Sequence, residues 1–123
     1  MIEGLTGKRI LIIEDEYLIA ADLKRALVDA GAVIVGPAAT LEAGQILVEE
    51  DIDLALLDVN LDGEHCYPLA SRLRDRSVPL VFLTGYDEWA LPPEYRDVPR
   101  IGKPFPLAQL IDQLSALSPA AQT

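Results

Sequence analysis

The sequence contains little that would cross-link the chain or hold it in a membrane. Its single cysteine, Cys66, cannot form an internal disulfide, so a reducing compartment is expected. No apolar run approaches the roughly 20 residues that span a bilayer. Residues 1–4 carry neither the basic nor the apolar region of a signal peptide. These absences predict a cytoplasmic protein without a membrane segment.

Positive charge is also scarce. Ten Lys and Arg residues stand against 20 Asp and Glu residues in a chain of 123, which gives a net charge of −10. Such a chain lacks the cationic surface that binding to nucleic-acid phosphates requires. Half of the residues are apolar, which is typical of a globular protein and argues against disorder. We therefore expect one domain, residues 1–123 with a core over about 8–117, that binds neither nucleic acid nor a membrane.

Strand and helix patterns alternate along the chain. Short apolar or β-branched runs predict buried strands, and apolar residues recurring every three or four positions predict amphipathic helices. Gly31 stands where the first helix should be capped, and Pro37 should end the second strand. The predicted strands are 8–14, 32–36, 53–58, 79–84 and 100–103; the predicted helices are 19–30, 40–50, 66–74 and 106–117; residues 60–63 form a loop, and 85–99 hold at most one short helix.

This alternation predicts an α/β fold in which a parallel sheet carries helices on both faces. In such sheets, ligands bind beyond the carboxyl ends of the strands, where the strand order reverses. The predicted strands end at Glu14-Asp15, at Asp58, at Thr84 and near Lys103. Four separate pieces of sequence therefore bring acids, a hydroxyl and an ammonium group to one edge of the sheet.

These side chains predict metal-dependent phosphoryl transfer. Converging carboxylates without a nearby arginine require a cation, and hard oxygen ligands favour Mg²⁺, or Mn²⁺ in its place. A metal ion, a lysine and a hydroxyl together match the oxygens of a phosphoryl group. A carboxylate such as Asp58 can itself be the nucleophile and become an aspartyl phosphate.

The strand ends carry, in order, the pair Glu14-Asp15, then Asp58, then Thr84, then Lys103-Pro104. With these motifs at these places, the chain resembles the receiver domain of two-component response regulators. The resemblance covers nearly the whole chain. It implies a doubly wound, flavodoxin-like fold, with a five-stranded parallel sheet in the order 2-1-3-4-5, and a role in bacterial two-component signalling.

Two segments, 81–87 and 103–105, resemble a subgroup of single-domain receivers named for a Phe-Ala-Thr-Gly-type (FAT GUY-like) motif. Leu83 stands where that name expects Ala. The subgroup is associated with alphaproteobacterial signalling and phosphorelays. The resemblance therefore implies a receiver that is not followed by an output domain.

The family resemblance assigns the metal ligands. It implies that Asp15 binds Mg²⁺ directly, that Asp58 shares the ion, and that Glu14 acts mostly through water. The backbone carbonyl of Asn60 would supply a further ligand.

The resemblance also assigns the phosphoryl contacts. Asp58 would accept the phosphoryl group from a histidine kinase or histidine phosphotransferase. Thr84 would then donate a hydrogen bond to that group, and Lys103 would pair with it, with the Lys103–Pro104 peptide bond in the cis form. The protein would signal by protein–protein interaction or act as a phosphate shuttle or sink, and beyond its own phosphorylation and slow dephosphorylation it would not be an enzyme.

One position departs from the family pattern. Arg100 stands where receivers usually carry Tyr or Phe, so the output is expected to use another surface, with segment 85–99 and Tyr86 as candidates. Tyr86 could also screen the phosphoryl group from water. Several neighbouring residues receive structural interpretations: Glu16 as a first-turn acid, His65 as a surface residue, Cys66 as helix packing, and Trp89 and Tyr95 as local packing.

Two other functions remain open from the sequence. "DVNLD", at 58–62, faintly resembles the start of haloacid dehalogenase-type phosphatases, but Asn60 replaces their second Asp and there is no room for a cap domain. A pseudo-receiver that only binds or dimerises is supported by Arg100 alone.

Overall fold

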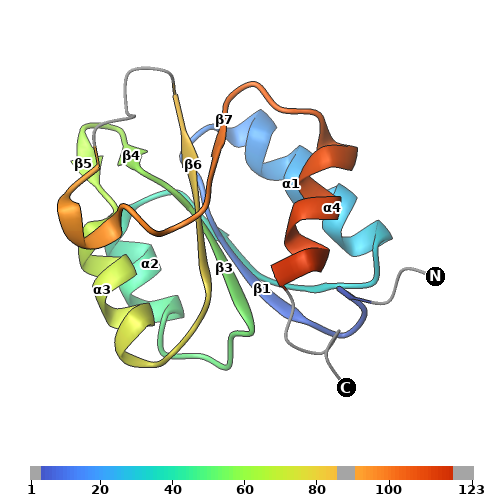
Figure 1. Cartoon of the computed structure of the whole chain (residues 1–123), viewed down its shortest axis with the longest axis horizontal. Helices are drawn as coiled ribbons and strands as arrows, with labels where there is room; N and C mark the ends of the chain where they lie inside the picture. The colour runs from blue at the N-terminus through green and yellow to red at the C-terminus, as the bar shows by residue number, and fades with distance from the viewer. Residues whose placement is uncertain (1–3, 86–90, 118–123) are drawn as a thin grey trace.

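Residues 4–85 and 91–117 are described by the computed structural model, and within them five strands form one parallel sheet (Figure 1). The order across the sheet is β2-β1-β3-β6-β7, which places β1 between β2 and β3 and reverses the order between β1 and β3. A small antiparallel hairpin lies apart from this sheet. The strands of the sheet are β1 (Arg9–Ile13), β2 (Val33–Ala38), β3 (Leu54–Asp58), β6 (Leu80–Thr84) and β7 (Arg100–Gly102), and those of the hairpin are β4 (Asn60–Leu61) and β5 (Glu64–His65).

Helices cover both faces of the sheet. Figure 1 shows α1 and α4 on one face and α2 and α3 on the other. None of the helices in the described ranges is long and apolar enough to cross a membrane. The helices are α1 (Tyr17–Asp29), α2 (Leu41–Leu47), α3 (Tyr67–Asp75) and α4 (Leu107–Leu117), with a short 3₁₀ helix η1 (Pro93–Tyr95).

The apolar core is split into two layers by the sheet. Because successive side chains of a strand point to opposite faces, Leu11 and Ile13 of β1 pack with α2 and α3, whereas Ile10 and Ile12 pack with α1 and α4. All four are fully buried. Burial on both faces explains why the central strands are continuous apolar runs. Each such side chain stabilises the fold by about 1.5–3 kcal/mol.

The helix and strand boundaries largely follow the sequence pattern. Gly31 lies just beyond α1 with φ of +97°, a left-handed backbone that favours glycine at a helix end. Thr40 caps α2, and its hydroxyl accepts a hydrogen bond from the Ala43 N–H at 3.1 Å. Between β6 and β7, the described residues contain one short helix, η1, as expected for segment 85–99.

The second strand does not end at Pro37. β2 continues to Ala38, although the pattern predicted that proline would stop it. β2 is an edge strand, and its register with β1 shifts between Leu11 and Ile13. A residue without an N–H is tolerated at such an edge irregularity because no ladder hydrogen bond is lost there.

The second helix ends at Leu47 rather than near residue 50. Arg76 explains the early end, because its guanidinium donates hydrogen bonds to the carbonyls of Val48 and Glu50. Because Arg76, which follows α3, donates to these two carbonyls, they do not need hydrogen bonds from a further turn of α2.

Residues 60–65 form a hairpin, whereas the sequence interpretation placed a loop at 60–63. Asp62 and Gly63 occupy its turn, with φ of +53° and +94°. Two consecutive positive φ values define the type I′ turn for which Asp-Gly is a preferred sequence. The Asp62-Gly63 pair is thus a sequence signal for this hairpin, and the prediction of a loop at 60–63 was wrong.

Candidate functional site

Polar side chains converge at the carboxyl edge of the sheet. Asp58 and Thr84 are the last residues of β3 and β6, and Glu14 directly follows β1. Their exposed fractions are 3%, 5% and 2%. Because polar groups are costly to bury without partners, their concentration at the point where the strand order reverses marks this edge as the candidate site.

Lys103 is the counter-ion of the buried acids. Its Nζ lies 2.8 Å from Asp58 Oδ2, and 2.9 and 3.0 Å from the two carboxylate oxygens of Glu14. Its backbone N–H donates to the Thr84 carbonyl at 2.7 Å, which fixes the start of the side chain beside β6. The Lys103–Pro104 peptide bond is cis, as predicted. One ammonium group thus contacts two nearly inaccessible carboxylates.

Glu16 also reaches this cluster, contrary to its interpretation as a mere first-turn acid. Its Oε1 lies 3.5 Å from Lys103 Nζ, while its backbone N–H donates to Glu14 Oε2 at 3.0 Å. It occupies the N-cap position of α1, but its side chain accepts no hydrogen bond from the first turn, all of which is described. Glu16 has the extended backbone angles usual at an N-cap, φ −86° and ψ 113°, but its carboxylate is directed to Lys103 and not to the first turn of α1.

The acids of the cluster fit a metal ion. Glu14, Asp15 and Asp58 each offer a carboxylate oxygen, and these oxygens lie within 4.8 Å of one another. Glu14 Oε1 lies near the ammonium but outside hydrogen-bonding geometry, and no other described group donates to it. Three carboxylates against one lysine leave negative charge uncompensated. Hard oxygen donors with residual negative charge are suited to a divalent cation.

Burial dominates the acid–base behaviour of Asp58. Desolvation raises the pKa of its carboxyl from the usual 3.8 to about 8, the Lys103 ammonium opposes the rise, and the Glu14 carboxylate adds to it. Burial alone would lower the pKa of Lys103, but its hydrogen bonds with Asp58 and Glu14 raise it above the ordinary value. The lysine is therefore protonated at neutral pH, and negative charge on Asp58 is costly until more positive charge arrives.

Asn60 connects the cluster to the β4–β5 hairpin. Its N–H donates to Asp58 Oδ1 at 3.1 Å, and its side-chain oxygen accepts from the Gly63 N–H at 2.7 Å. The turn of the hairpin therefore holds Asn60 against the aspartate. Asn60 therefore lies beside the acids, and the family resemblance implies that its backbone carbonyl is a further metal ligand.

The cluster opens into a cleft of about 690 Å³. Its walls come from the segment after β1 with the start of α1, the end of β3, the β4–β5 hairpin and the residues that follow β6 and β7. The residues that line it are Asp15, Glu16, Ile19, Asp58, Asn60, Asp62, Gly63, Gly85, Lys103 and Pro104. Asp58 therefore lies at the wall of the cleft, whereas Glu14 does not line it.

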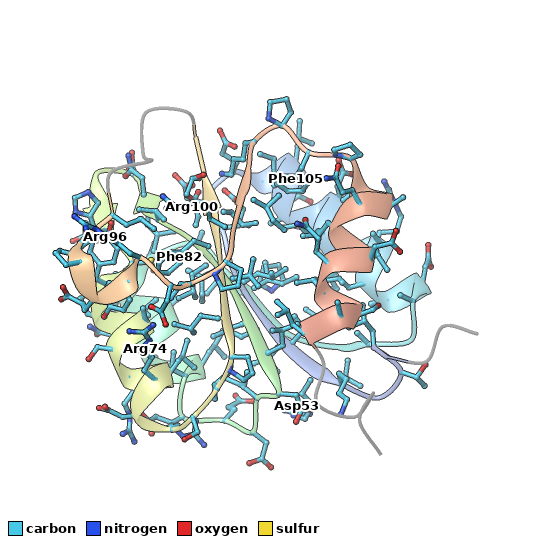
Figure 2. The ribbon with its side chains drawn as sticks, in the orientation of Figure 1. Asp53, Arg74, Phe82, Arg96, Arg100 and Phe105 are labelled. Carbon is cyan, nitrogen blue, oxygen red and sulfur yellow. The ribbon has the colours of Figure 1, made fainter. Side chains whose placement is uncertain are left out.

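An aromatic cluster joins α3, β6 and η1, and it includes Tyr95, for which the sequence predicted local packing. Tyr95 is buried and stacks on Tyr67 with ring centroids 5.3 Å apart. Both rings lie edge-on to Phe82 of β6, and the Arg74 guanidinium lies over Tyr95 at 5.0 Å. Figure 2 labels Arg74 and Phe82 on this side of the sheet. These contacts pack the η1 segment against α3.

The residues named for output are placed only in part. Arg100 is exposed on the edge strand β7, in register with Phe82 of the neighbouring strand β6, and Figure 2 labels both residues. Tyr86 and Trp89 lie outside the described residues. Cys66 is buried in the core and His65 is exposed, in agreement with their structural interpretations.

The sequence matches the response regulator receiver domain over residues 10–115. The chain belongs to this family. The receiver prediction is thereby confirmed, and so is the flavodoxin-like sheet. When the strands of the sheet are numbered one to five along the chain (β1, β2, β3, β6 and β7), they lie side by side in the predicted order 2-1-3-4-5.

Solved receiver structures resemble this one closely. SdrG from Sphingomonas melonis Fr1 is 39% identical with a TM-score of 0.79, and the match covers 94% of this chain and 98% of SdrG. The receiver domain of PhyR from Erythrobacter litoralis is 31% identical with a TM-score of 0.78, covering 90% and 89% of the two chains.

Among curated proteins, the aerobic respiration control protein ArcA of Escherichia coli K12 is 40% identical over 79 residues. The match covers 63% of this receiver but 33% of ArcA. The receiver thus corresponds to about a third of that relative.

Proposed function

We propose that this receiver forms a single functional unit, with its core over about residues 8–117, and accepts a phosphoryl group on Asp58. The observation that carries the proposal is the contact of Asp58 Oδ2 with Lys103 Nζ at 2.8 Å, inside a buried acidic cluster that opens to a cleft. The donor is a phosphohistidine of a histidine kinase or histidine phosphotransferase, as implied for the family. Output follows through binding of another protein, or by passing the phosphoryl group on.

Asp15 and Asp58 would hold Mg²⁺ directly, Glu14 mostly through water, and Asn60 through its backbone carbonyl. The oxygen cluster of the first three residues supports this assignment. When bound, the ion supplies positive charge that offsets both the clustered carboxylates and the oxygens of an incoming phosphoryl group.

In the transfer step, a carboxylate oxygen of Asp58 attacks phosphorus. The bond between phosphorus and the histidine nitrogen breaks, and the imidazole leaves with the bonding electrons. Lys103, already beside Asp58, pairs with the phosphoryl oxygens, and the Thr84 hydroxyl donates a hydrogen bond to them. These residues act by position and charge, so no general base on this chain is needed.

Intact-mass spectrometry tests the proposal. The protein is incubated with acetyl phosphate and Mg²⁺, alongside the same mixture with EDTA and alongside Asp58→Asn. We expect one added phosphoryl group in the first sample and none in the other two. Asp62→Asn is the matched control, because it removes an acid from the same cleft at a residue that contributes no ligand in this scheme.

A mass gain in Asp58→Asn equal to that of the unaltered protein would overturn the assignment of the acceptor. If the unaltered protein gains no mass, incubation with a phosphorylated histidine phosphotransferase is the decisive second arm. Failure there too would leave a pseudo-receiver that binds without accepting phosphate.

A further inference from the structure

Among the residues that the structure describes, Glu16 is the acid that lines the cleft with an exposed side chain and also contacts Lys103. Its side chain is 59% exposed, whereas that of Glu14, on the same ammonium, is inaccessible. Glu16 lines the cleft through which a donor must reach Asp58. A donor therefore meets this carboxylate before it meets the buried cluster.

The position of Glu16 is not explained by helix capping. Ser, Thr, Asp and Asn are the preferred N-cap residues because their short side chains accept from the first turn. Glu16 stands at the N-cap of α1 without such a bond, and its carboxylate is directed to Lys103 instead. The side chain of Glu16 therefore contacts Lys103 and does not stabilise α1 as a cap.

Two electrostatic effects follow from this placement. The Glu16 carboxylate repels an anionic donor at the mouth of the cleft. It also competes for Lys103, whose ammonium must turn to the phosphoryl oxygens during transfer. Both effects increase with the negative charge of the donor, because the Coulomb energy scales with that charge.

We propose that Glu16 is a specificity-determining residue that disfavours small, highly charged phosphoryl donors relative to less charged ones. This inference rests on the proposed phosphorylation of Asp58. In this scheme, Glu16 slows the phosphorylation of Asp58 by a small, highly charged acyl phosphate more than it slows phosphorylation by a donor with lower charge at the transferred group.

Two small donors separate the charge effect from the chemistry. Acetyl phosphate carries one more negative charge at neutral pH than phosphoramidate. In both reactions an Asp58 oxygen forms a bond to phosphorus. The phosphorus–oxygen bond of acetyl phosphate breaks to release acetate, and the phosphorus–nitrogen bond of phosphoramidate, whose nitrogen is already protonated, breaks to release ammonia.

The experiment measures the initial phosphorylation rate with each donor, in Mg²⁺, for the unaltered protein and for Glu16→Gln. We expect the ratio of the acetyl phosphate rate to the phosphoramidate rate to rise on the order of fivefold in the variant. Added salt should shrink the change, because an exposed charge is screened.

Two further variants separate the local charge of Glu16 from helix stability and from net charge. Glu16→Ser removes the charge and supplies a preferred N-cap, so it should give the same rise even if helix stability changes. Asp29→Asn removes the same net charge at the far end of α1, about 20 Å from Glu16 along the helix, where screening makes it ineffective.

An unchanged donor ratio in both Glu16 variants, with normal phosphorylation of the unaltered protein, would overturn this inference and leave the proposed function intact. An equal rise in Asp29→Asn would also overturn it, since net charge alone would then be responsible. If neither donor phosphorylates any of the four proteins, both the inference and small-donor phosphorylation of Asp58 fail together.

Discussion

Lys103 Nζ lies 2.8 Å from Asp58 Oδ2, across 45 residues of sequence, and the same ammonium serves Glu14 across 89 residues. A single side chain thus compensates two carboxylates that have almost no access to water. Removing one partner of a buried ion pair leaves an uncompensated charge, which is more damaging than the loss of an exposed pair.

Lys103→Gln is therefore expected to lower the free energy of unfolding by about 3 kcal/mol in the absence of divalent ions. Mg²⁺ should restore much of this loss, because the ion would take over the compensation of Asp58 and Glu14. Urea denaturation with Mg²⁺ or with EDTA measures both effects. Lys24→Gln, on the exposed face of α1, is the control and should change little. A Lys103 variant as stable as the unaltered protein in EDTA would contradict the prediction.

The raised pKa of Asp58 predicts a pH dependence of stability. Between the ordinary value of 3.8 and the folded value of about 8, the folded protein retains a proton that the unfolded chain has lost. The unfolded state then binds fewer protons, so the contribution of Asp58 to stability falls as pH rises through this window. Asp58→Asn, which cannot ionise, should be more stable than the unaltered protein by about 2 kcal/mol at pH 8 without metal.

Thermal unfolding of both proteins at pH 5 and pH 8 measures this difference. The gap in melting temperature should widen toward pH 8 in EDTA and narrow when Mg²⁺ is added. A gap of constant size across the two pH values would show that Asp58 does not titrate in this range.

Thr84→Val replaces a buried hydroxyl by a methyl group of similar size. The fold should persist, because the position is a buried end of the otherwise apolar strand β6 and its backbone contact with Lys103 is unchanged. The rate of phosphorylation by acetyl phosphate should fall by about tenfold to hundredfold, since one donor to the phosphoryl oxygens is lost. Thr84→Ser keeps that donor and should retain most of the rate; an equal loss in Ser and Val would point to packing instead.

Gly63→Ala tests the hairpin that holds Asn60. An added Cβ meets no atom within 4 Å, so the expected cost of about 1 kcal/mol comes from the backbone, whose φ is +94°. Metal affinity, measured by isothermal titration with Mn²⁺, should weaken with it, because Gly63 donates to Asn60 beside Asp58. Gly63→Asn, which tolerates positive φ better, should be the milder change. Equal affinity in all three proteins would mean that the hairpin does not position the site.

The fold and the membership of the cluster were predictable because both depend on strand order. Once alternating strands and helices define a parallel sheet, residues that follow strand ends must meet at one edge. Asp58, Thr84 and Lys103 are of this kind, and the structure places all three there. Their meeting follows from topology and requires no knowledge of side-chain geometry.

What could not be predicted depends on individual side-chain directions. Glu16 follows the strand by three positions, and whether it caps α1 or turns to Lys103 is decided by its rotamer and not by its spacing. Similarly, the end of α2 depends on Arg76, which is 26 residues away from the Glu50 carbonyl that it satisfies. Long-range hydrogen bonds of this kind leave no periodic signal in the sequence.

The Lys103 contacts also link the assembly of the site to the folding of the whole chain. The acids near residues 14 and 58 are synthesised long before the lysine that neutralises them, and the pairing closes loops of 45 and 89 residues. Closing loops of this length costs chain entropy before the contacts can repay it, which slows folding. Until β7 docks on β6, Lys103 is not held beside Asp58 and Glu14, so the proposed acceptance of a phosphoryl group requires this last strand to be in place.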